Sequence, residues 1–221
     1  MKNSRVPRKI NLFLAFLFVA IVFLLLSYKT ILIKAGNFLA PERNGKADVV
    51  ILEGSDLIKW NAVKIGIGLL SSEKVNRLVV VVHQASENAR PFALPDYPLL
   101  ISKNLEDLGL KKNQFLIITV PSNRPVTLTE ARIVLSILSQ NGVKSTILLA
   151  EGFHTRRSYW AYKQVGLPLG IEVIPYPYFV DFRKDIWWQQ IDVLYEYVNQ
   201  LLKYIYYLIR GYIPLKSIFV T

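Results

Sequence analysis

The block from His154 to Ser158, read as HTRRS, holds side chains suited to both proton transfer and anion binding. An imidazole ionises near neutral pH, and guanidinium groups bind phosphate and carboxylate oxygens in pairs. The block follows an apolar run, Thr146–Ala150, and precedes a helical pattern. A strand, a tight turn and a helix start bring backbone N–H groups and the positive end of a helix dipole to one point. The sequence therefore predicts an anion site here, most simply for a phosphate or a carboxylate.

The elements that must position this block alternate regularly along the chain. Strands of the buried type are predicted at Asp48–Leu52, Arg77–Val82, Phe115–Val120, Thr146–Ala150 and Ile171–Ile174. Helical patterns separate them, and Pro175 and Pro177 are expected to end the fifth strand. Strands that are apolar throughout and alternate with helices predict an α/β fold, with an open, mostly parallel, Rossmann-like sheet of five strands covered by helices on both faces.

Ligands of such sheets bind beyond the carboxyl ends of the strands, so the candidate residues are those that follow each strand. Both histidines of the chain fall on this rim. The candidates for proton transfer and its orientation are His154, Glu53 and Glu130. The candidates for anion or substrate binding are Gly54, Ser55, Asp56, His83, Ser122, Thr127, Arg156, Arg157 and Ser158.

Several of these residues also have a simpler structural interpretation. Glu130 fits a capping box in which Thr127 is the N-cap, and Asp56 could serve only as the N-cap of the helix that follows it. Arg156 and Arg157 are adjacent, so they point about 100° apart on a helix. Only one of the two is expected to face the cleft, and the other is expected to be a solvated surface charge.

Glu53 is harder to assign to a structural role, because a carboxylate beside a buried sheet needs a partner. Arg157 or a bound cation could supply one. Two histidines with Glu53 and Asp56 could also hold a metal, but their spacing is not diagnostic, so no metal ligand is assigned.

Several other chemistries lack their motifs in this sequence. There is no Gly-x-Gly-x-x-Gly, Walker-type loop or Gly-x-Ser-x-Gly elbow, so a standard nucleotide site and an α/β-hydrolase are disfavoured, and the cofactor is left unknown. The absence of cysteine excludes thiol catalysis.

The N-terminus has the pattern of a membrane anchor. Residues Leu12–Leu26 are continuously apolar, and four basic residues precede them. The positive-inside rule then predicts a cytoplasmic tail over 1–9, a transmembrane anchor over 10–33, a linker over 34–46 and an extracytoplasmic α/β domain over 47–221. A cleaved signal peptide is the alternative. Much of the net charge of +11 lies near this segment, so a nucleic-acid partner is not predicted.

The last long segment, about 186–210, is predicted to be an amphipathic helix with Ile191, Val198 and Leu202 on its apolar face. Two roles are open for this face. It could pack on the sheet or its neighbouring helices, or the Tyr-rich end of the helix could touch the membrane interface where the anchor emerges.

Several stretches together resemble the YdcF/SanA/ElyC-like family, a group of bacterial envelope-associated domains without a defined activity. They are the anchor, ADVVILEGS, the Thr127–Ala131 helix start and GFHTRRS, and the pair Trp187–Trp188 is similar to the membrane-anchored branch. The resemblance implies a pocket formed by Glu53, Gly54, Thr127, Glu130, His154, Arg157 and Ser158. The chain departs from the family in having less glycine after its first two strands.

With this resemblance, the sequence predicts a single-pass protein of the bacterial inner membrane with its main domain in the periplasm. Its cleft would bind an anionic, phosphate-bearing metabolite or a lipid-linked cell-wall precursor, and an enzyme of this kind would be a hydrolase or transferase. The alternative is a non-catalytic envelope-assembly or ligand-sensing factor that works through partner binding. His154 would transfer the proton, Arg157 would hold the phosphate, and Glu53 or Glu130 would orient them.

Overall fold

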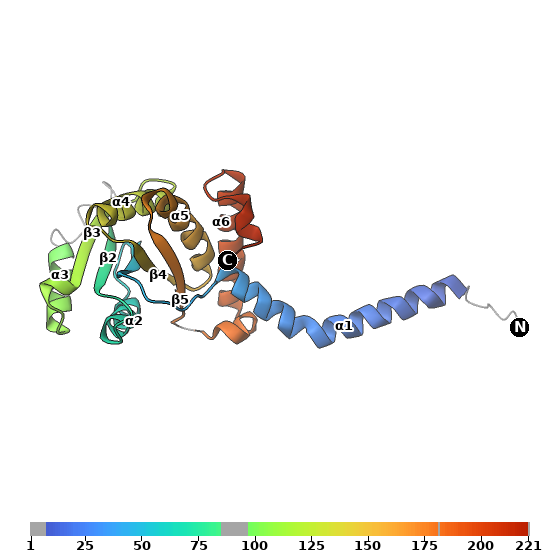
Figure 1. Ribbon diagram of the computed structural model, residues 1–221. Coiled ribbons are helices and arrows are strands. Elements are labelled where there is room, and N and C mark those ends of the chain that lie inside the picture. The colour runs from blue at the N-terminus through green and yellow to red at the C-terminus, as the bar shows by residue number, and fades with distance from the viewer. Residues whose placement is uncertain (1–7, 85–96, 181, 221) are drawn as a thin grey trace, which may run out of the picture.

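The computed structural model describes residues 8–84, 97–180 and 182–220, and its centre is a five-stranded sheet in the order β3-β2-β1-β4-β5 (Figure 1). The strands are β1 (Val49–Ser55), β2 (Arg77–Gln84), β3 (Phe115–Pro121), β4 (Ser145–Glu151) and β5 (Glu172–Tyr178). Each pairing between them is parallel. The predicted α/β, Rossmann-like fold is confirmed.

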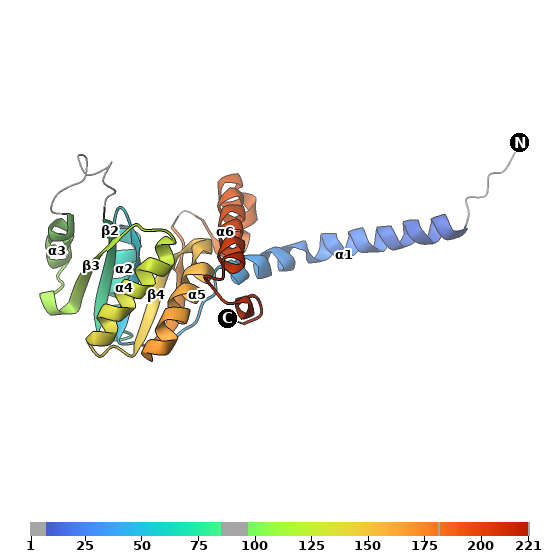
Figure 2. The same ribbon diagram turned by 90° about the horizontal axis from the view of Figure 1, so that it is seen from above.

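Helices cover both faces of the sheet, as Figure 2 shows from above. One face packs on α2 (Trp60–Ser71) and α3 (Tyr97–Asp107), and the other packs on α4 (Val126–Gln140) and α5 (Thr155–Gly166). Alternate residues of a strand point to opposite faces, so Val50 and Leu52 join the first core while Val49 and Ile51 join the second. This alternation explains why the strands are apolar throughout.

The fifth strand is longer than predicted. Pro175 and Pro177 lie inside β5 and pair with Leu148 and Ala150 of β4. A proline lacks only the N–H donor, and β5 is an edge strand with a ladder on one side, so both prolines are accommodated.

The N-terminal helix α1 (Arg8–Leu39) extends through residues 34–39, which had been predicted as linker. The indole of Trp187 fixes this end of the helix, because its Nε1 donates to the carbonyl oxygen of Leu32 at 2.9 Å. A Cβ on Gly36 would lie 2.9 Å from the same Nε1, so glycine permits this close contact. Residues 1–7 of the predicted tail lie outside the described part of the chain.

Within the residues that the structure describes, no single helix is long and apolar enough to cross a bilayer. The segments Leu12–Phe23 and Leu25–Leu39 meet that criterion only together, and they are bent by 49° relative to one another. The expectation of one uninterrupted transmembrane helix over 10–33 is therefore not supported.

The terminal helix α6 (Ile191–Ile209) follows a 3-10 segment, Lys184–Gln189, in the region predicted as helical. Its buried residues are Val193, Tyr204 and Tyr207, not the apolar face predicted to pack on the domain. Ile191 on that face is 76% exposed. Leu201 and Leu208, on one edge of the predicted apolar side, pack against the core, so packing on the domain holds for that edge, while Ile191, Val198 and Leu202 stay exposed.

Candidate functional site

The candidate site lies at the carboxyl ends of β1 and β4, where the strand order reverses direction. Such a switch point leaves a crevice at the edge of a parallel sheet. The pairing of β1 with β2 shifts register between Leu52 and Ser55, so Glu53 and Gly54 depart from the regular ladder at this point. On the neighbouring strand, Gly152 adopts φ +49° and turns the chain into the 3-10 segment that ends at His154. The two strand ends therefore deliver Glu53 and His154 to one place.

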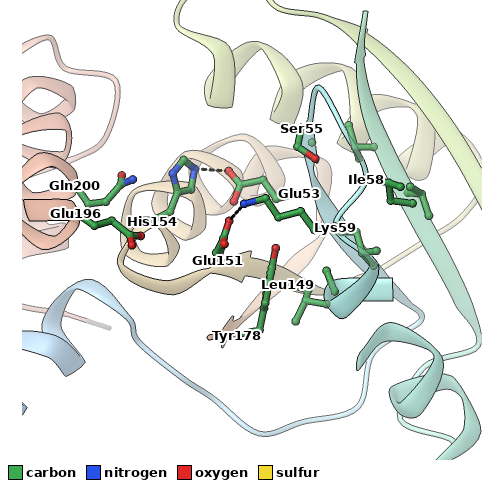
Figure 3. A pocket seen from close by; sticks show the side chains of 15 residues that line it. Glu53, Ser55, Ile58, Lys59, Leu149, Glu151, His154, Tyr178, Glu196 and Gln200 are labelled. Carbon is green, nitrogen blue, oxygen red and sulfur yellow. Dashed lines mark hydrogen bonds and ion pairs between the residues drawn. The ribbon is translucent and has the colours of Figure 1, made fainter. Parts of the chain in front are cut away.

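The site contains two carboxylate–histidine pairs. Glu53 and His154 form the first, and Figure 3 shows it. His154 Nε2 lies 2.7 Å from Glu53 Oε1, and Ser158 Oγ donates to the same oxygen at 2.5 Å. Arg157 Nη2 lies 2.8 Å from His154 Nδ1. A guanidinium group only donates, so Nδ1 is the acceptor and Nε2 carries the hydrogen that goes to Glu53. Both ring nitrogens of His154 are therefore occupied.

Glu130 and His83 form the second pair. Glu130 Oε2 lies 2.8 Å from His83 Nε2, while Oε1 accepts from the backbone N–H of Gly54 at 3.0 Å and from the Tyr162 hydroxyl at 2.6 Å. Glu130 is 1% exposed. The capping-box interpretation is wrong, because Pro125 is the N-cap of α4 and no side chain caps that helix. Glu130 instead orients His83 from within the core.

Burial and hydrogen bonding act in opposite directions on these groups. Burial raises the pKa of Glu53, but the charges and hydrogen bonds of His154, Ser158 and Arg157 outweigh it and hold that pKa below its usual value. The hydrogen bond that His83 donates to Glu130 raises the pKa of His83, although burial acts in the opposite direction. Burial and the Glu130 charge raise the pKa of Tyr162, so its hydroxyl keeps its proton and donates. The contact with Glu130 thus makes the His83 ring a stronger base.

Arg157 is the arginine that faces the crevice. Its Nη1 donates to Thr127 Oγ1 at 2.8 Å, and its guanidinium carbon lies 4.8 Å from the ring centre of Tyr207. The side chain is buried, and its Nε has no hydrogen-bond partner among the described residues. A buried donor of this kind is costly unless a ligand satisfies it.

Arg156, a predicted anion-binding residue, does not belong to the site, and it is not a solvated surface charge either. It is 3% exposed and donates to the carbonyl oxygens of Phe38 at 2.9 Å, Val220 at 3.1 Å and Ser217. Its role is to join α5 to the end of α1 and to the C-terminal tail.

Two cavities meet at Glu53, Gly54 and His154. The larger has a volume of about 530 Å³, and its other polar or aromatic lining residues are His83, Arg124, Thr127, Glu130, Arg157, Lys203, Tyr206, Tyr207 and Tyr212. The smaller, of about 170 Å³, is lined by Ser55, Lys59, Glu151, Tyr178, Glu196 and Gln200 among others (Figure 3). Lys59 and Glu151 form an ion pair across it.

Sequence reasoning missed Arg124, Lys203 and the tyrosines of the terminal segment. Arg124 precedes a cis proline at the start of α4, and the others come from α6 and the turn after it. No local motif marks these residues, since α6 reaches the rim only through tertiary packing.

Some predicted residues lie away from the larger cavity. Ser122 is exposed, with its Oγ 3.4 Å from the carbonyl oxygen of Gln84, and it lines neither cavity. Asp56 is exposed at 3.7 Å from His83 Nδ1, and it is not an N-cap because α2 begins after Lys59. Ser55 lines the smaller cavity.

Within the described residues, the Ser158 hydroxyl hydrogen-bonds to the carboxylate of Glu53 and the carbonyl oxygen of His154, so it supports the first pair, and it does not line either cavity. Within the described ranges, His, Asp and Glu side chains form no group of three suited to a metal ion.

Comparisons with protein-family models, with curated proteins and with solved structures give no match to this chain. The fold and the site therefore define it as an α/β protein with a parallel, doubly wound sheet and a polar crevice at the switch point.

Proposed function

We propose that the larger cavity binds an anionic, phosphate-bearing ligand and that Arg157 is its principal contact. The observation that carries this proposal is the buried guanidinium of Arg157, whose Nε lacks a partner within the described residues while the side chain lines the cavity. Charge supports it, because Arg124, Arg157 and Lys203 supply three cationic groups against the two carboxylates Glu53 and Glu130. Each of the two carboxylates already pairs with a histidine, so the three cationic groups favour an anion in this cavity.

A proton-transfer role fits His83 better than His154. His83 directs Nε2 to Glu130, and among the described residues the partner near its Nδ1 is Asp56, at 3.7 Å. A water or hydroxyl that attacks a phosphoryl group would give its proton to Nδ1 of neutral His83, and Glu130 would stabilise the imidazolium. Arg157 would hold the phosphoryl oxygens as charge moves to the leaving group. The reaction class is hydrolysis or transfer of a phosphate-containing substrate.

The proposal includes a membrane anchor in the bacterial inner membrane, with the N-terminus in the cytoplasm and the domain in the periplasm. Side chains of α1 from Leu12 to Ile31 are mostly apolar and exposed, for example Phe18 at 68% and Leu26 at 81%. A helix that is apolar on all sides and unburied in its own chain fits a lipid environment. The resemblance to envelope proteins points to a role in envelope biogenesis or barrier function.

The test is a thermal-shift titration of the full chain in detergent with inorganic phosphate, phosphate monoesters and polyprenyl phosphate. Stabilisation of the native chain that is lost in Arg157→Ala, and kept in the exposed control Arg183→Ala, is the expected result. No shift with any of these compounds would overturn the anion site.

His83→Gln then separates the two classes of function. A catalyst should lose turnover of a phosphate ester in this variant while keeping most of its binding. Binding without turnover in the native chain would instead favour the non-catalytic assembly or sensing factor.

A further inference from the structure

The terminal helix α6 carries a broad apolar face that nothing in the described chain covers. Ile191, Tyr195, Val198, Leu202 and Ile209 follow one another at steps of three, four or seven residues and are 76%, 71%, 46%, 59% and 79% exposed. At about 100° per residue, they and Leu194, Ile205 and Tyr206 occupy one arc of roughly 120°. We call these eight residues the outer face of α6.

The opposite side of α6 faces the protein. Val193, Tyr204 and Tyr207 are buried, and the ring of Tyr204 packs edge-on against Phe38 of α1 with 5.6 Å between ring centres. Asp192, Lys203 and Arg210 lie on one flank between the two sides, as their spacing along the helix requires. The outer face is therefore free of charged side chains.

The position of α6 in the fold determines which way its outer face points. Figures 1 and 2 both show α6 at the end of the domain from which α1 departs, running across the direction of α1. The hydroxyl of Tyr197 donates to the carbonyl oxygen of Ala35 at 3.3 Å, which ties the two helices together. Because the buried side of α6 packs on the domain, its outer face points away from the domain, to the side where the apolar part of α1 extends.

We propose that the outer face of α6 lies in the interfacial layer of the bilayer that α1 enters. A helix with a polar flank and an uncharged apolar face binds a membrane surface parallel to its plane. Tyr195 and Tyr206 on this face are of the type enriched at the membrane–water boundary. Leu215 and Phe219 in the tail after the helix are also apolar and exposed, at 69% and 86%.

A second copy of the chain is a less suitable occupant. A coiled-coil seam is a narrow stripe whose flanking positions carry charges that pair across the interface. Here Leu194 and Tyr206 occupy the flanks of the stripe, so the apolar face is wider than such a seam.

Docking of α6 would also fix the position of the larger cavity relative to the membrane. Tyr206 belongs to the outer face and lines the larger cavity, and Lys203 lines the same cavity. The mouth of the cavity would then open at the membrane surface. This inference rests on the membrane anchor of the proposed function, but it does not depend on the ligand.

The chain has no cysteine, so one introduced thiol gives one spin label. The full chain, labelled at Leu202→Cys, Phe18→Cys or Lys103→Cys, is reconstituted in vesicles of phosphatidylethanolamine and phosphatidylglycerol. All three positions are exposed, and they report on α6, on the anchor and on the far helix α3. We expect labels at 202 and 18 to collide several-fold more with oxygen, which enters lipid, than with a water-soluble nickel complex, and the label at 103 to show the reverse.

Water-like collisions at 202 combined with lipid-like collisions at 18 would overturn the docking of α6 and leave the anchor intact. Spin–spin broadening at 202 would overturn it in favour of a second copy. Water-like collisions at 18 would reject the anchor itself, and the docking with it.

Discussion

His83 and His154 are each held by a buried carboxylate, but their second ring nitrogens differ. Arg157 lies against Nδ1 of His154, so that ring cannot take a proton unless the arginine moves. Nδ1 of His83 has no hydrogen bond within the described chain and lies on a wall of the larger cavity. The His83 ring is held in this orientation by Glu130, whose carboxylate is in turn fixed by two other donors, the backbone N–H of Gly54 and the Tyr162 hydroxyl.

We predict that Glu130→Gln lowers the pKa of His83. In the native chain the pKa of His83 is raised above 6.5, so the folded state binds the proton more tightly than the unfolded state. The resulting stabilisation is complete below about pH 6.5 and is lost as the pH rises through the folded-state value. An NMR titration of the two imidazoles, assigned with His154→Gln, measures the change, and thermal unfolding over the same pH range checks the linkage.

The exposed carboxylate Glu106 supplies the control, since Glu106→Gln should leave the pKa of His83 unchanged. An equal pKa in Glu130→Gln and in the native chain would contradict the orienting role of Glu130.

At the scale of elements, the site depends on the end of β1. The register shift after Leu52 turns the backbone N–H of Gly54 toward Glu130 of α4, while His83 arrives from the end of β2. The three elements approach so closely that a Cβ on Gly54 would lie 2.5 Å from Glu130 Oε2 and 2.6 Å from His83 Nε2. Glycine is needed here for space.

We predict that Gly54→Ala destabilises the fold by about 1–3 kcal/mol and weakens phosphate binding, because the methyl group must push the second pair apart. The control is Gly68→Ala in α2, where an added Cβ meets nothing within 4 Å. That change should stabilise the chain by up to about 1 kcal/mol, since alanine favours a helix. Denaturant unfolding in detergent measures both, and a neutral Gly54→Ala would disprove the packing argument.

For the molecule as a whole, Arg156 connects the α/β domain to the end of α1 and to the C-terminal tail. Its guanidinium reaches the end of α1 at Phe38 and the tail at Ser217 and Val220, and it lies 4.0 Å from the ring centre of Phe38. Because Arg156 lies in the first turn of α5 beside Arg157, the helix that carries Arg157 is fixed to the helix that leads toward the proposed membrane. The charged side chain of Arg156 thus holds α5 and α1 together.

We predict that Arg156→Met lowers the free energy of unfolding by about 3 kcal/mol or more, because several carbonyl oxygens lose a charged donor in a buried place. Hydrogen exchange should also increase in the tail after residue 213. Arg183→Met, at an exposed arginine that pairs with the exposed Asp185, should change stability by less than about 0.5 kcal/mol. Equal effects of the two variants would show that Arg156 does not hold the parts together.

The sequence by itself determined the parallel sheet, the approximate bounds of its elements and the rim on which the polar residues gather. These follow from local signals, because runs of apolar residues and their spacing specify strands and helices, and the carboxyl ends of parallel strands share one edge. Only the tertiary structure decided the partners on that rim. Glu53 and His154 are 101 residues apart in sequence, and His83 and Glu130 are 47 apart.

The same distinction between local pattern and tertiary contact explains why the predictions for Arg156 and α6 were incomplete. Arg156 was a candidate anion ligand, one of the two arginines was expected to be a surface charge, and the apolar face of α6 was open to packing on the domain. A helical pattern shows which residues share a face but not what that face meets. Burial is set by contacts between distant segments. Here those contacts place the end of α1 and the C-terminal tail over Arg156 and leave the outer face of α6 uncovered within the described chain.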